Sequence, residues 1–270
     1  MNLTGFSVAG METCIEVPAL KLVLDMGRCS RTAAQHPLVL LSHGHIDHMG
    51  GVAHHAARRS MMSMSEGVYL VPKAVAPAVE AFFNAAGALD GQTIARRIVP
   101  LEPGEEFSLG KNRWVRPFET FHRVASQGYT IWERRHRLRE EFRGKEPAEL
   151  GALRRQGVAI EDAHEVPILS FTGDTRIEVL ERCEELQRTE TLVMETTFLD
   201  ARVSVDEARA MGHIHLNEVA SRSDLLPTAD VVFTHFSARY SATDIASLIE
   251  QALPEGVRER VRVLAAESPA

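Results

Sequence analysis

Short apolar runs alternate with amphipathic stretches along this chain, and the alternation predicts strands and helices in turn. Apolar runs bounded by polar or turn-forming residues predict strands at 19–24, 37–41, 68–71, 114–118, 166–171, 191–194 and 230–234. Helical spacing of apolar positions predicts helices at 51–60, 73–86, 176–187, 217–223 and 242–252. This α/β pattern favours sheets whose faces are covered by helices.

The order of the elements limits the topology. The early strands are close together, with little room for crossover helices, so an antiparallel or mixed sheet is expected there. Two layered sheets with outer helices fit the pattern. The 270 residues show no repeat, low-complexity tract or clear linker, which predicts one domain over 1–270 with a frayed end at 265–270.

The strand predicted at 37–41 leads directly into Ser42-His43-Gly-His45-Ile-Asp47-His48, which has four metal-ligating side chains within six residues. A lone histidine is usually a satisfied structural side chain, but four ligands at this spacing indicate a metal site. His43 and His45 alternate on an extended backbone and can face one ion, whereas Asp47 and His48 follow a turn and can face a second. Imidazole and carboxylate without thiolate favour zinc, with iron and manganese as competitors, and open positions point to catalysis.

Later strand candidates also carry polar clusters at their C-terminal ends, where the loops of α/β folds usually build sites. The side chains concerned are His122 after 114–118, Asp174 after 166–171, Glu195 after 191–194 and His235 after 230–234. Taken singly, His122 or His235 is more commonly a buried structural histidine than a ligand. Together with the first cluster, these side chains complete two coordination shells.

The composition is that of a folded protein with an acidic balance. Apolar residues make up 44% of the chain and charged residues 25%, which is ordinary for a globular protein with a sizeable core. The net charge of −7 argues against a generally basic nucleic-acid-binding surface but leaves a local basic patch open.

The cysteines and the apolar windows bear on the compartment. Cys14, Cys29 and Cys183 are widely spaced and odd in number, so they indicate neither a disulfide framework nor a thiolate zinc site. The first residues lack a basic segment followed by a long apolar core, and no window reaches the 18 or more apolar residues of a membrane span. These observations predict a cytoplasmic enzyme without a membrane segment.

With these motifs the chain resembles the metallo-β-lactamase-fold hydrolases and, among them, ribonuclease Z and its relatives. The superfamily's HxHxDH signature is matched by His43-Gly-His45-Ile-Asp47-His48. The later motifs of the ribonuclease Z branch resemble Phe121-His122 with Gly128-Tyr129, Ser170-Phe-Thr-Gly-Asp174-Thr, Glu195-Thr-Thr-Phe and Thr234-His235-Phe-Ser-Ala-Arg-Tyr240. The resemblance implies a four-layer αββα sandwich with metals at one edge of the two sheets.

The resemblance also implies a ligand set. One zinc ion would be bound by His43, His45 and His122, the other by Asp47, His48 and His235, with Asp174 bridging both. Two cations would lower the pKa of a bridging water and give a hydroxide nucleophile, so Asp47 is counted among the catalytic residues. Asp25 is expected to orient the ligand loop from behind, with a plain turn-capping role as the alternative.

The segment Met211-Gly-His213-Ile-His215-Leu-Asn resembles the family's Gly-His-Ser motif, whose histidine is thought to protonate the leaving oxygen. His213 is therefore the candidate general acid. Glu195 is the candidate that orients His213, or it caps a strand end. His215 stands where the family has a small polar residue, and it is a candidate substrate contact, alternative acid or extra ligand.

Two further positions are candidates for substrate binding. Arg239 can clamp a phosphate through its planar guanidinium, with a plain surface or sheet-edge position as the alternative. Ser237 lies two residues before it in the same motif.

The tRNA-trimming members of this branch usually carry a long arm rich in Gly and Pro, and this sequence shows no such segment. Residues 132–145 form a basic, helical-looking stretch, and the 146–158 segment that follows is too short for a full arm. A basic helical insertion around 132–160 is therefore predicted. Six basic against three acidic residues in 133–145 can meet phosphates, or they lie on a solvated helix with compensating charges.

The leading hypothesis is a dinuclear zinc-dependent phosphodiesterase, a ribonuclease Z-like endoribonuclease that acts on precursor tRNA, another RNA or a small phosphodiester. An acyl or thioester hydrolase is the alternative, because the same metals polarise a carbonyl. A third hypothesis is a non-catalytic protein that kept the fold. The resemblance further implies a homodimer.

Overall fold

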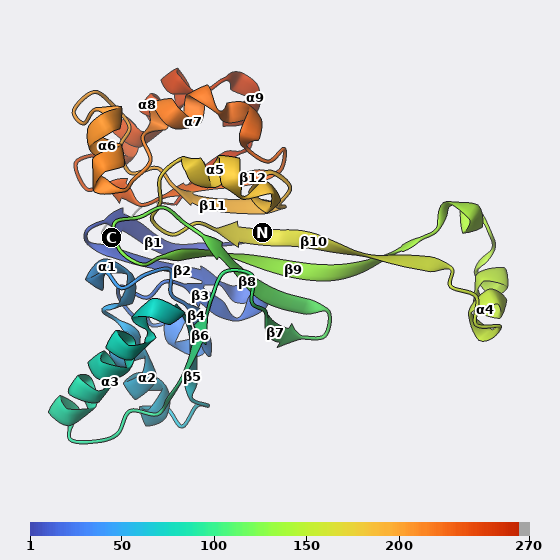
Figure 1. Cartoon of the computed structure of the whole chain (residues 1–270), viewed down its shortest axis with the longest axis horizontal. Coiled ribbons are helices and arrows are strands. Elements are labelled where there is room, and N and C mark those ends of the chain that lie inside the picture. Colours follow the sequence, from blue (N-terminus) through green and yellow to red (C-terminus); the bar gives the residue numbers. More distant parts are fainter. Residues whose placement is uncertain (265–270) are drawn as a thin grey trace.

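The computed structural model describes residues 1–264, which form two seven-stranded sheets packed face to face with helices on both outer faces (Figure 1). The predicted four-layer αββα sandwich is confirmed. The frayed end expected at 265–270 lies outside the described residues.

The first sheet is mixed, as the close spacing of the early strands predicted. Its strand order is β13-β1-β2-β3-β4-β5-β6. The strands are β1 (Thr4–Ala9), β2 (Glu12–Val17), β3 (Leu22–Leu24), β4 (Leu38–Leu40), β5 (Gly67–Pro72), β6 (Arg96–Leu101) and β13 (Phe236–Ser237). The pairs β1–β2 and β2–β3 are antiparallel, and β3 to β6 run parallel.

The second sheet has the order β14-β12-β11-β10-β9-β8-β7. Its strands are β7 (Phe107–Gly110), β8 (Arg113–Glu119), β9 (Gln127–Leu138), β10 (Glu161–Phe171), β11 (Thr191–Glu195), β12 (Asp230–Thr234) and β14 (Val261–Val263). The strands from β10 to β14 are parallel, and β7 to β10 are antiparallel.

Nine α-helices occur within residues 1–264. They are α1 (Ile46–Met49), α2 (Val52–Met61), α3 (Ala76–Asp90), α4 (Pro147–Arg155), α5 (Glu178–Arg182), α6 (Val205–Met211), α7 (Leu216–Ser221), α8 (Ala242–Ala252) and α9 (Glu255–Arg258). In Figure 1, α2 and α3 lie against the first sheet, and α5 to α9 lie over the second.

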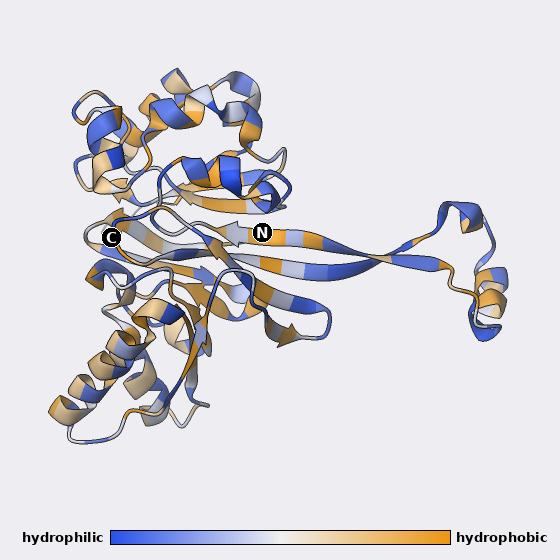
Figure 2. Ribbon diagram, viewed as in Figure 1, coloured by the Kyte–Doolittle hydropathy of each residue, from blue (hydrophilic) through white to orange (hydrophobic). Residues whose placement is uncertain are grey.

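The apolar side chains explain this layering. One cluster lies between the sheets and joins residues such as Leu40 of the first sheet to Leu169 of the second. Separate clusters pack Phe83 of α3 on the first sheet and Ile249 of α8 on the second. Burial of each such side chain contributes roughly 1.5–3 kcal/mol. Because both faces of the central strands are covered, their sequences are nearly continuous apolar runs (Figure 2).

The predicted strands and helices all have counterparts, but the prediction for residues 132–145 is wrong. Residues up to Leu138 belong to β9, which pairs with β10 as far as Glu161. Helical structure in the segment is confined to a short 3₁₀ helix at Glu140–Phe142 and to α4. Pairing of β8 with β9 ends at Glu133, so the ladder beyond that residue has two strands only.

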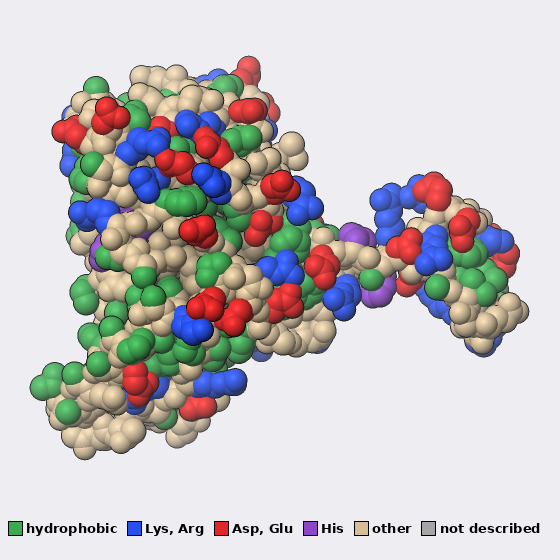
Figure 3. All heavy atoms as spheres, viewed as in Figure 1, with side chains coloured by type: hydrophobic (Ala, Val, Ile, Leu, Met, Phe, Trp, Pro, Cys, Tyr) green, Lys and Arg blue, Asp and Glu red, His purple; other side chains and the backbone are tan. Residues whose placement is uncertain are grey.

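These two strands and α4 at their tip project from the body as an arm, defined here as residues 134–165 (Figure 1). Residues 146–158 were expected to be too short for a full arm, but the structure forms a projecting arm all the same, because strands of 12 and 11 residues on either side carry the chain outward. The arm turns hydrophilic where it leaves the sheet, and cationic and anionic side chains are interspersed along it (Figures 2 and 3).

None of the helices in residues 1–264 is both long enough and apolar enough to cross a membrane.

Candidate metal centre

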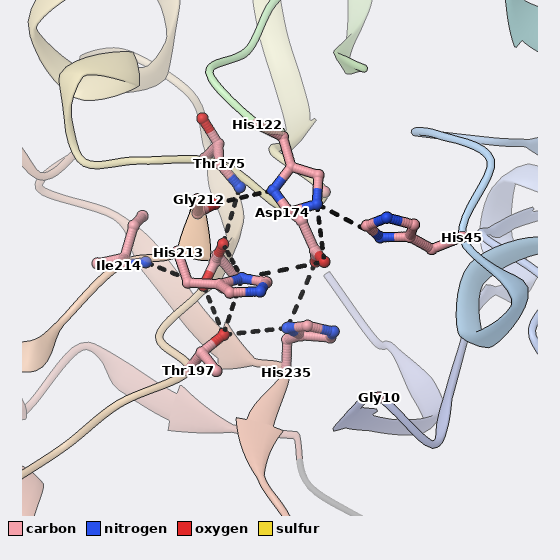
Figure 4. Close-up of polar contacts among 12 residues, drawn as sticks. Gly10, His45, His122, Asp174, Thr175, Thr197, Gly212, His213, Ile214 and His235 are labelled. Atoms are coloured by element: carbon pink, nitrogen blue, oxygen red, sulfur yellow. Dashed lines mark hydrogen bonds and ion pairs between the residues drawn. The ribbon is translucent and has the colours of Figure 1, made fainter. Parts of the chain in front are cut away.

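Loops from several strands bring the site residues to one edge of the two sheets (Figure 4). His43 follows β4, His122 follows β8, Asp174 follows β10 and His235 follows β12. The fold thus brings together side chains that are 187 positions apart in the chain, such as His48 and His235. This is the edge at which α/β folds usually bind ligands.

The loop after β4 is fixed from behind by a buried carboxylate. Asp25 accepts hydrogen bonds from the backbone N–H of Ser42 (2.6 Å) and from the Ser42 hydroxyl (2.7 Å). It also accepts from Nδ1 of His48 at 2.7 Å. Asp25 itself has a left-handed φ of 56°, which is uncommon outside glycine. The predicted role of Asp25 behind the ligand loop agrees with these contacts.

The short helix α1 is held by the neighbouring strands. The backbone N–H of Gly10 donates to Asp47 Oδ2 at 2.8 Å, and that of Met26 donates to the His48 carbonyl at 2.6 Å. A Cβ at Gly27 would lie 1.9 Å from the Asp47 carbonyl oxygen, so this close approach requires glycine.

The first ligand group consists of His43, His45, His122 and Asp174, whose ligand atoms lie within 4.8 Å of one another. Nδ1 of His45 lies 2.9 Å from Nε2 of His43 and 3.4 Å from Nε2 of His122. Burial lowers the pKa of each of these three histidines, which keeps the rings neutral as metal ligands must be.

The second group consists of Asp47, His48 and His235. The Nε2 atoms of His48 and His235 are 3.1 Å apart, and Asp47 Oδ2 lies 3.6 and 3.7 Å from them. Burial opposes the charge on Asp47, but His235 and His48 hold its pKa below the usual range. Asp47 is therefore a carboxylate that suits a metal ligand and not a proton donor.

Asp174 lies between the two groups. Its Oδ2 is 3.4 Å from Nε2 of His48 and 3.7 Å from Nε2 of His43. Although burial opposes ionisation, His235 and His48 hold the pKa of Asp174 well below its usual value. Its Oδ1 is buried without a hydrogen-bond partner. An ionised, buried oxygen without a donor fits a bridging ligand of two cations.

The outer nitrogens of the rings support the same fit. Four rings form a hydrogen bond through Nδ1 with a residue outside the two ligand groups. The pairs are His43 with Ser42 Oγ (2.9 Å), His48 with Asp25, His122 with the Gly212 carbonyl (2.9 Å) and His235 with Thr197 Oγ1 (3.0 Å). A neutral imidazole that donates through Nδ1 has its lone pair on Nε2. These lone pairs point at the cluster, and nitrogen and oxygen ligands without sulfur suit zinc, iron or manganese.

The pKa of His48 reflects the negative charge of the carboxylates around it. Burial opposes a charge on this ring, yet Asp174 and Asp25 raise its pKa well above the ordinary value. The carboxylates thus attract positive charge to this point, and a bound cation would displace the second proton of the ring.

His213, which is labelled in Figure 4, is oriented by a second buried carboxylate, that of Glu195. Glu195 Oε1 accepts from His213 Nδ1 at 3.0 Å and from the Thr175 backbone at 2.7 Å. Its Oε2 accepts from Thr197 Oγ1 at 2.6 Å and from the Ile214 backbone at 3.1 Å. Burial opposes the charge on His213, but Glu195 raises its pKa to about 9. Nε2 of His213 is the nitrogen left for a substrate.

The expected substrate contact at His215 is wrong. The ring is 1% exposed and caps α7, because its Nδ1 accepts from the Asn217 backbone at 3.1 Å. Its Nε2 lies 3.2 Å from the Asp200 carbonyl oxygen. Both ring nitrogens are engaged inside the protein, so neither is left for an extra metal ion or a proton transfer.

Ser237 ends β13, and Arg239 lies on the loop that follows it. Arg239 is exposed, and its Nε donates to Ser237 Oγ at 3.0 Å. The guanidinium also lies over the ring of Phe198, 5.5 Å from its centroid. Phe198 in turn contacts the His213 ring edge-on, with centroids 6.1 Å apart. This chain of contacts places an exposed cation close to the candidate acid, and the phosphate-binding role of Arg239 stays a prediction.

Sequence reasoning assigned no role to Thr197 or Gly212. Thr197 joins the His235 ring to Glu195, and its place in the Glu195-Thr-Thr motif was the available signal. Gly212 accepts from His122 through its carbonyl, and a Cβ there would lie 2.8 Å from His122 Nδ1. With a left-handed φ of 83°, this position requires glycine, but its partner is 90 residues away in the chain.

The fold and the paired histidine–aspartate groups define a class of protein, the metal-dependent hydrolases with a metallo-β-lactamase fold. Residues 22–236 match the family model described as a β-lactamase superfamily domain. Human tRNase Z, short form, has a similar structure, with a TM-score of 0.62 and 16% identity over 97% of this chain and 95% of that one.

Sequence comparison narrows this class. The chain is 36% identical to tRNase Z TRZ1 of Arabidopsis thaliana over 97% of its own length and 94% of the relative's. It is 32% identical to the chloroplastic tRNase Z TRZ2 of the same plant, over 92% of this chain and 70% of the relative. The chain belongs to the tRNase Z family of the β-lactamase superfamily.

Proposed function

We propose that this protein is a zinc-dependent endoribonuclease that removes the 3′ trailer of precursor tRNA. The observation that carries the proposal is the hydrogen bond between His213 and buried Glu195, 3.0 Å long, beside two complete ligand groups. Membership of the tRNase Z family supports the substrate class.

The metal ions, when bound, polarise the phosphate and lower the pKa of a water molecule at the site. The protein's own contribution to proton transfer is His213. Its Nδ1 keeps its proton and donates a hydrogen bond to Glu195, and the Nε2 proton is donated to the leaving oxygen of the nucleotide. Glu195 favours the protonated ring, since it raises the pKa of His213 to about 9. Asp25, Thr197 and Gly212 hold the ligand rings in the orientation that this geometry needs.

Substrate phosphate is bound by Arg239 in this proposal. The guanidinium has a planar set of donors that matches two phosphate oxygens. Its contact with Phe198, and through that ring with His213, keeps it on the side of the cluster where the leaving group is protonated.

The arm is proposed to hold the RNA away from the cleavage site. Arg137, Arg139, Arg143 and His164 line a cavity of about 480 Å³ together with Asp162 and Glu140. Asp162 pairs with Arg139 and Glu140 pairs with Arg143, but each of these guanidinium groups has further donors. The three arginines and His164 are therefore all proposed to meet phosphates. Local basic character of this kind is compatible with the chain's net charge of −7.

The thioester form of the alternative is less well supported by this geometry. A thiolate leaving group needs no proton, whereas the alkoxide leaving group of a phosphodiester does. The Glu195–His213 pair, with a pKa of about 9 at the histidine, is therefore suited to a phosphodiester.

The test is to incubate the zinc-loaded protein with a precursor tRNA that carries a 3′ trailer, and separately with bis(p-nitrophenyl) phosphate and a thioester. We expect one cut at the trailer junction, lost in His43→Ala and Asp174→Ala and kept in His54→Ala, which alters an exposed histidine outside both groups. Thioester turnover without RNA cleavage would overturn the proposal.

The native metal is proposed as zinc and would be identified by metal analysis of the purified protein. A cytoplasmic location and a homodimer stay predictions, for cell fractionation and sedimentation to test.

A further inference from the structure

Three exposed apolar side chains belong to the loops and turns that carry or contact the candidate ligands. Within residues 1–264, eight large hydrophobic side chains are exposed, and the three beside the centre are Met11 (65%), Ile46 (67%) and Val124 (39%). The other five are spread over the ends of α2 and α3, the arm and β14. Scattered exposed apolar residues are ordinary, but a group at the opening of a polar site needs an explanation.

Neighbouring residues in the chain place each of the three beside a candidate ligand. Met11 lies in the β1–β2 turn next to Gly10, whose N–H donates to Asp47 at 2.8 Å. Ile46 stands between His45 and Asp47 as the first residue of α1. Val124 follows His122 by two residues in the loop whose Ser126 forms a bridge with His43. The three side chains, here called the collar, therefore flank both ligand groups.

Folding does not account for the collar. None of its members belongs to the buried clusters of the core or to the half-buried residues packed on them. Cationic side chains stand next to it: Arg123 is exposed and directly precedes Val124, and Arg239 is exposed near His213. An apolar surface bordered by cations is complementary to a nucleotide, which has an apolar base face and an anionic phosphate.

We propose that the collar binds the unstacked base of a nucleotide next to the scissile phosphate. This inference rests on the proposed function, because it requires an RNA phosphodiester at the metal centre. Aliphatic side chains contact the face of a base and offer no donor or acceptor to its edge. The contact therefore tolerates any base while requiring that a base be present and unpaired.

The experiment compares substrates that differ by one base. Precursor tRNAs are prepared with an abasic ribose immediately 5′ or immediately 3′ of the cleavage site, and KM and kcat are measured for each. In the unaltered protein, loss of the base on one side should lower kcat/KM about tenfold, equivalent to about 1.4 kcal/mol, mainly through KM. In the triple variant Met11→Gln, Ile46→Gln, Val124→Thr, the same loss should have little further effect, since the contact is already gone.

The control variant is Met61→Gln, Leu89→Gln, Val263→Thr, which changes exposed apolar residues away from the centre. It should behave as the unaltered protein with every substrate. If the collar variant remains as sensitive to base loss as the unaltered protein, or if sedimentation shows that it changes the oligomeric state, the inference is overturned. If the unaltered zinc-loaded protein cleaves no RNA, the proposed function itself has failed. If it cleaves RNA normally and the collar variant keeps its sensitivity to base loss, only the inference about the collar has failed.

Discussion

The ring of His48 donates through Nδ1 to the carboxylate of Asp25 at 2.7 Å, and its Nε2 faces His235 across the cluster at 3.1 Å. Both oxygens of Asp25 are occupied, because Ser42 donates to them through its backbone and its hydroxyl. One carboxylate thus fixes the tautomer of a ligand and the path of the loop that carries His43 and His45. Removal of the charge of Asp25 should therefore change the affinity for the metal while leaving both ligand groups intact.

Asp25→Asn is expected to lower zinc affinity about 10- to 100-fold. The amide NH₂ would face His48 Nδ1 and favour the opposite tautomer, in which Nε2 carries the proton and loses its lone pair. Competition with a chelator measures the affinity directly. Glu119→Gln, an exposed change on β8, is the control and should bind zinc normally. An unchanged affinity in Asp25→Asn would show that the hydrogen bond does not set the tautomer.

The decrease in rate on removal of the general acid should depend on the leaving group. His213→Ala is expected to slow RNA cleavage about 10²- to 10⁴-fold, the usual range for a positioned acid. Turnover of bis(p-nitrophenyl) phosphate should fall much less, because p-nitrophenolate leaves without protonation. Glu195→Gln should show the same selectivity to a smaller degree, since it leaves the ring but removes its anionic partner. Equal losses on both substrates, with normal zinc content, would exclude His213 as the acid.

The clustering of the candidate ligands was predictable from the sequence because each one follows an apolar strand, and the carboxyl ends of such strands meet at one edge. His215 was misread although a local signal was present: Glu218, three residues later, completes a capping box with the histidine as N-cap. Gly212 had no comparable signal, since its partner His122 is distant in sequence.

The arm was misread for a related reason. Residues 132–145 are rich in Arg and Glu, which are good helix formers, and the helical interpretation considered that segment alone. In the structure the charges pair across strands, as in Arg134 with Glu165 and Arg139 with Asp162. Long-range pairing of this kind overrides local propensity and cannot be read from one strand.

A buried histidine far from the metal centre gives a pH-dependent stability. His55 is 0% exposed, and its Nδ1 lies 2.7 Å from the Tyr69 hydroxyl. Burial lowers the pKa of His55 from 6.5 to about 4. Between these values the unfolded chain binds more protons than the folded protein. The contribution of neutral His55 is therefore complete above pH 6.5 and is lost as the pH falls towards 4.

Urea unfolding at pH 7.5 and pH 5 tests this. Between the two values, the unaltered protein should lose roughly 2 kcal/mol more unfolding free energy than His55→Gln, given the shift in pKa. The exposed neighbour offers a control: His54→Gln should keep the full pH dependence. Parallel pH profiles for the unaltered protein and His55→Gln would mean that other groups cause the dependence.

The arm should affect RNA binding and leave the chemistry of the centre unchanged. In Arg137→Gln, Arg139→Gln, Arg143→Gln, binding of precursor tRNA should weaken and its salt dependence should decrease. Each lost phosphate contact lowers the slope of log K against log salt by about 0.9 for a duplex. Turnover of bis(p-nitrophenyl) phosphate should stay normal, because β9 carries these arginines away from the edge where His43 bridges to Ser126 (Figure 1).

The control Arg31→Gln, Arg97→Gln, Arg188→Gln removes three exposed cations from the body and should keep the slope. Equal slopes for both triple variants would show that the arm's charges do not contact the RNA, whereas a loss of small-ester turnover would show that the arm supports the centre itself.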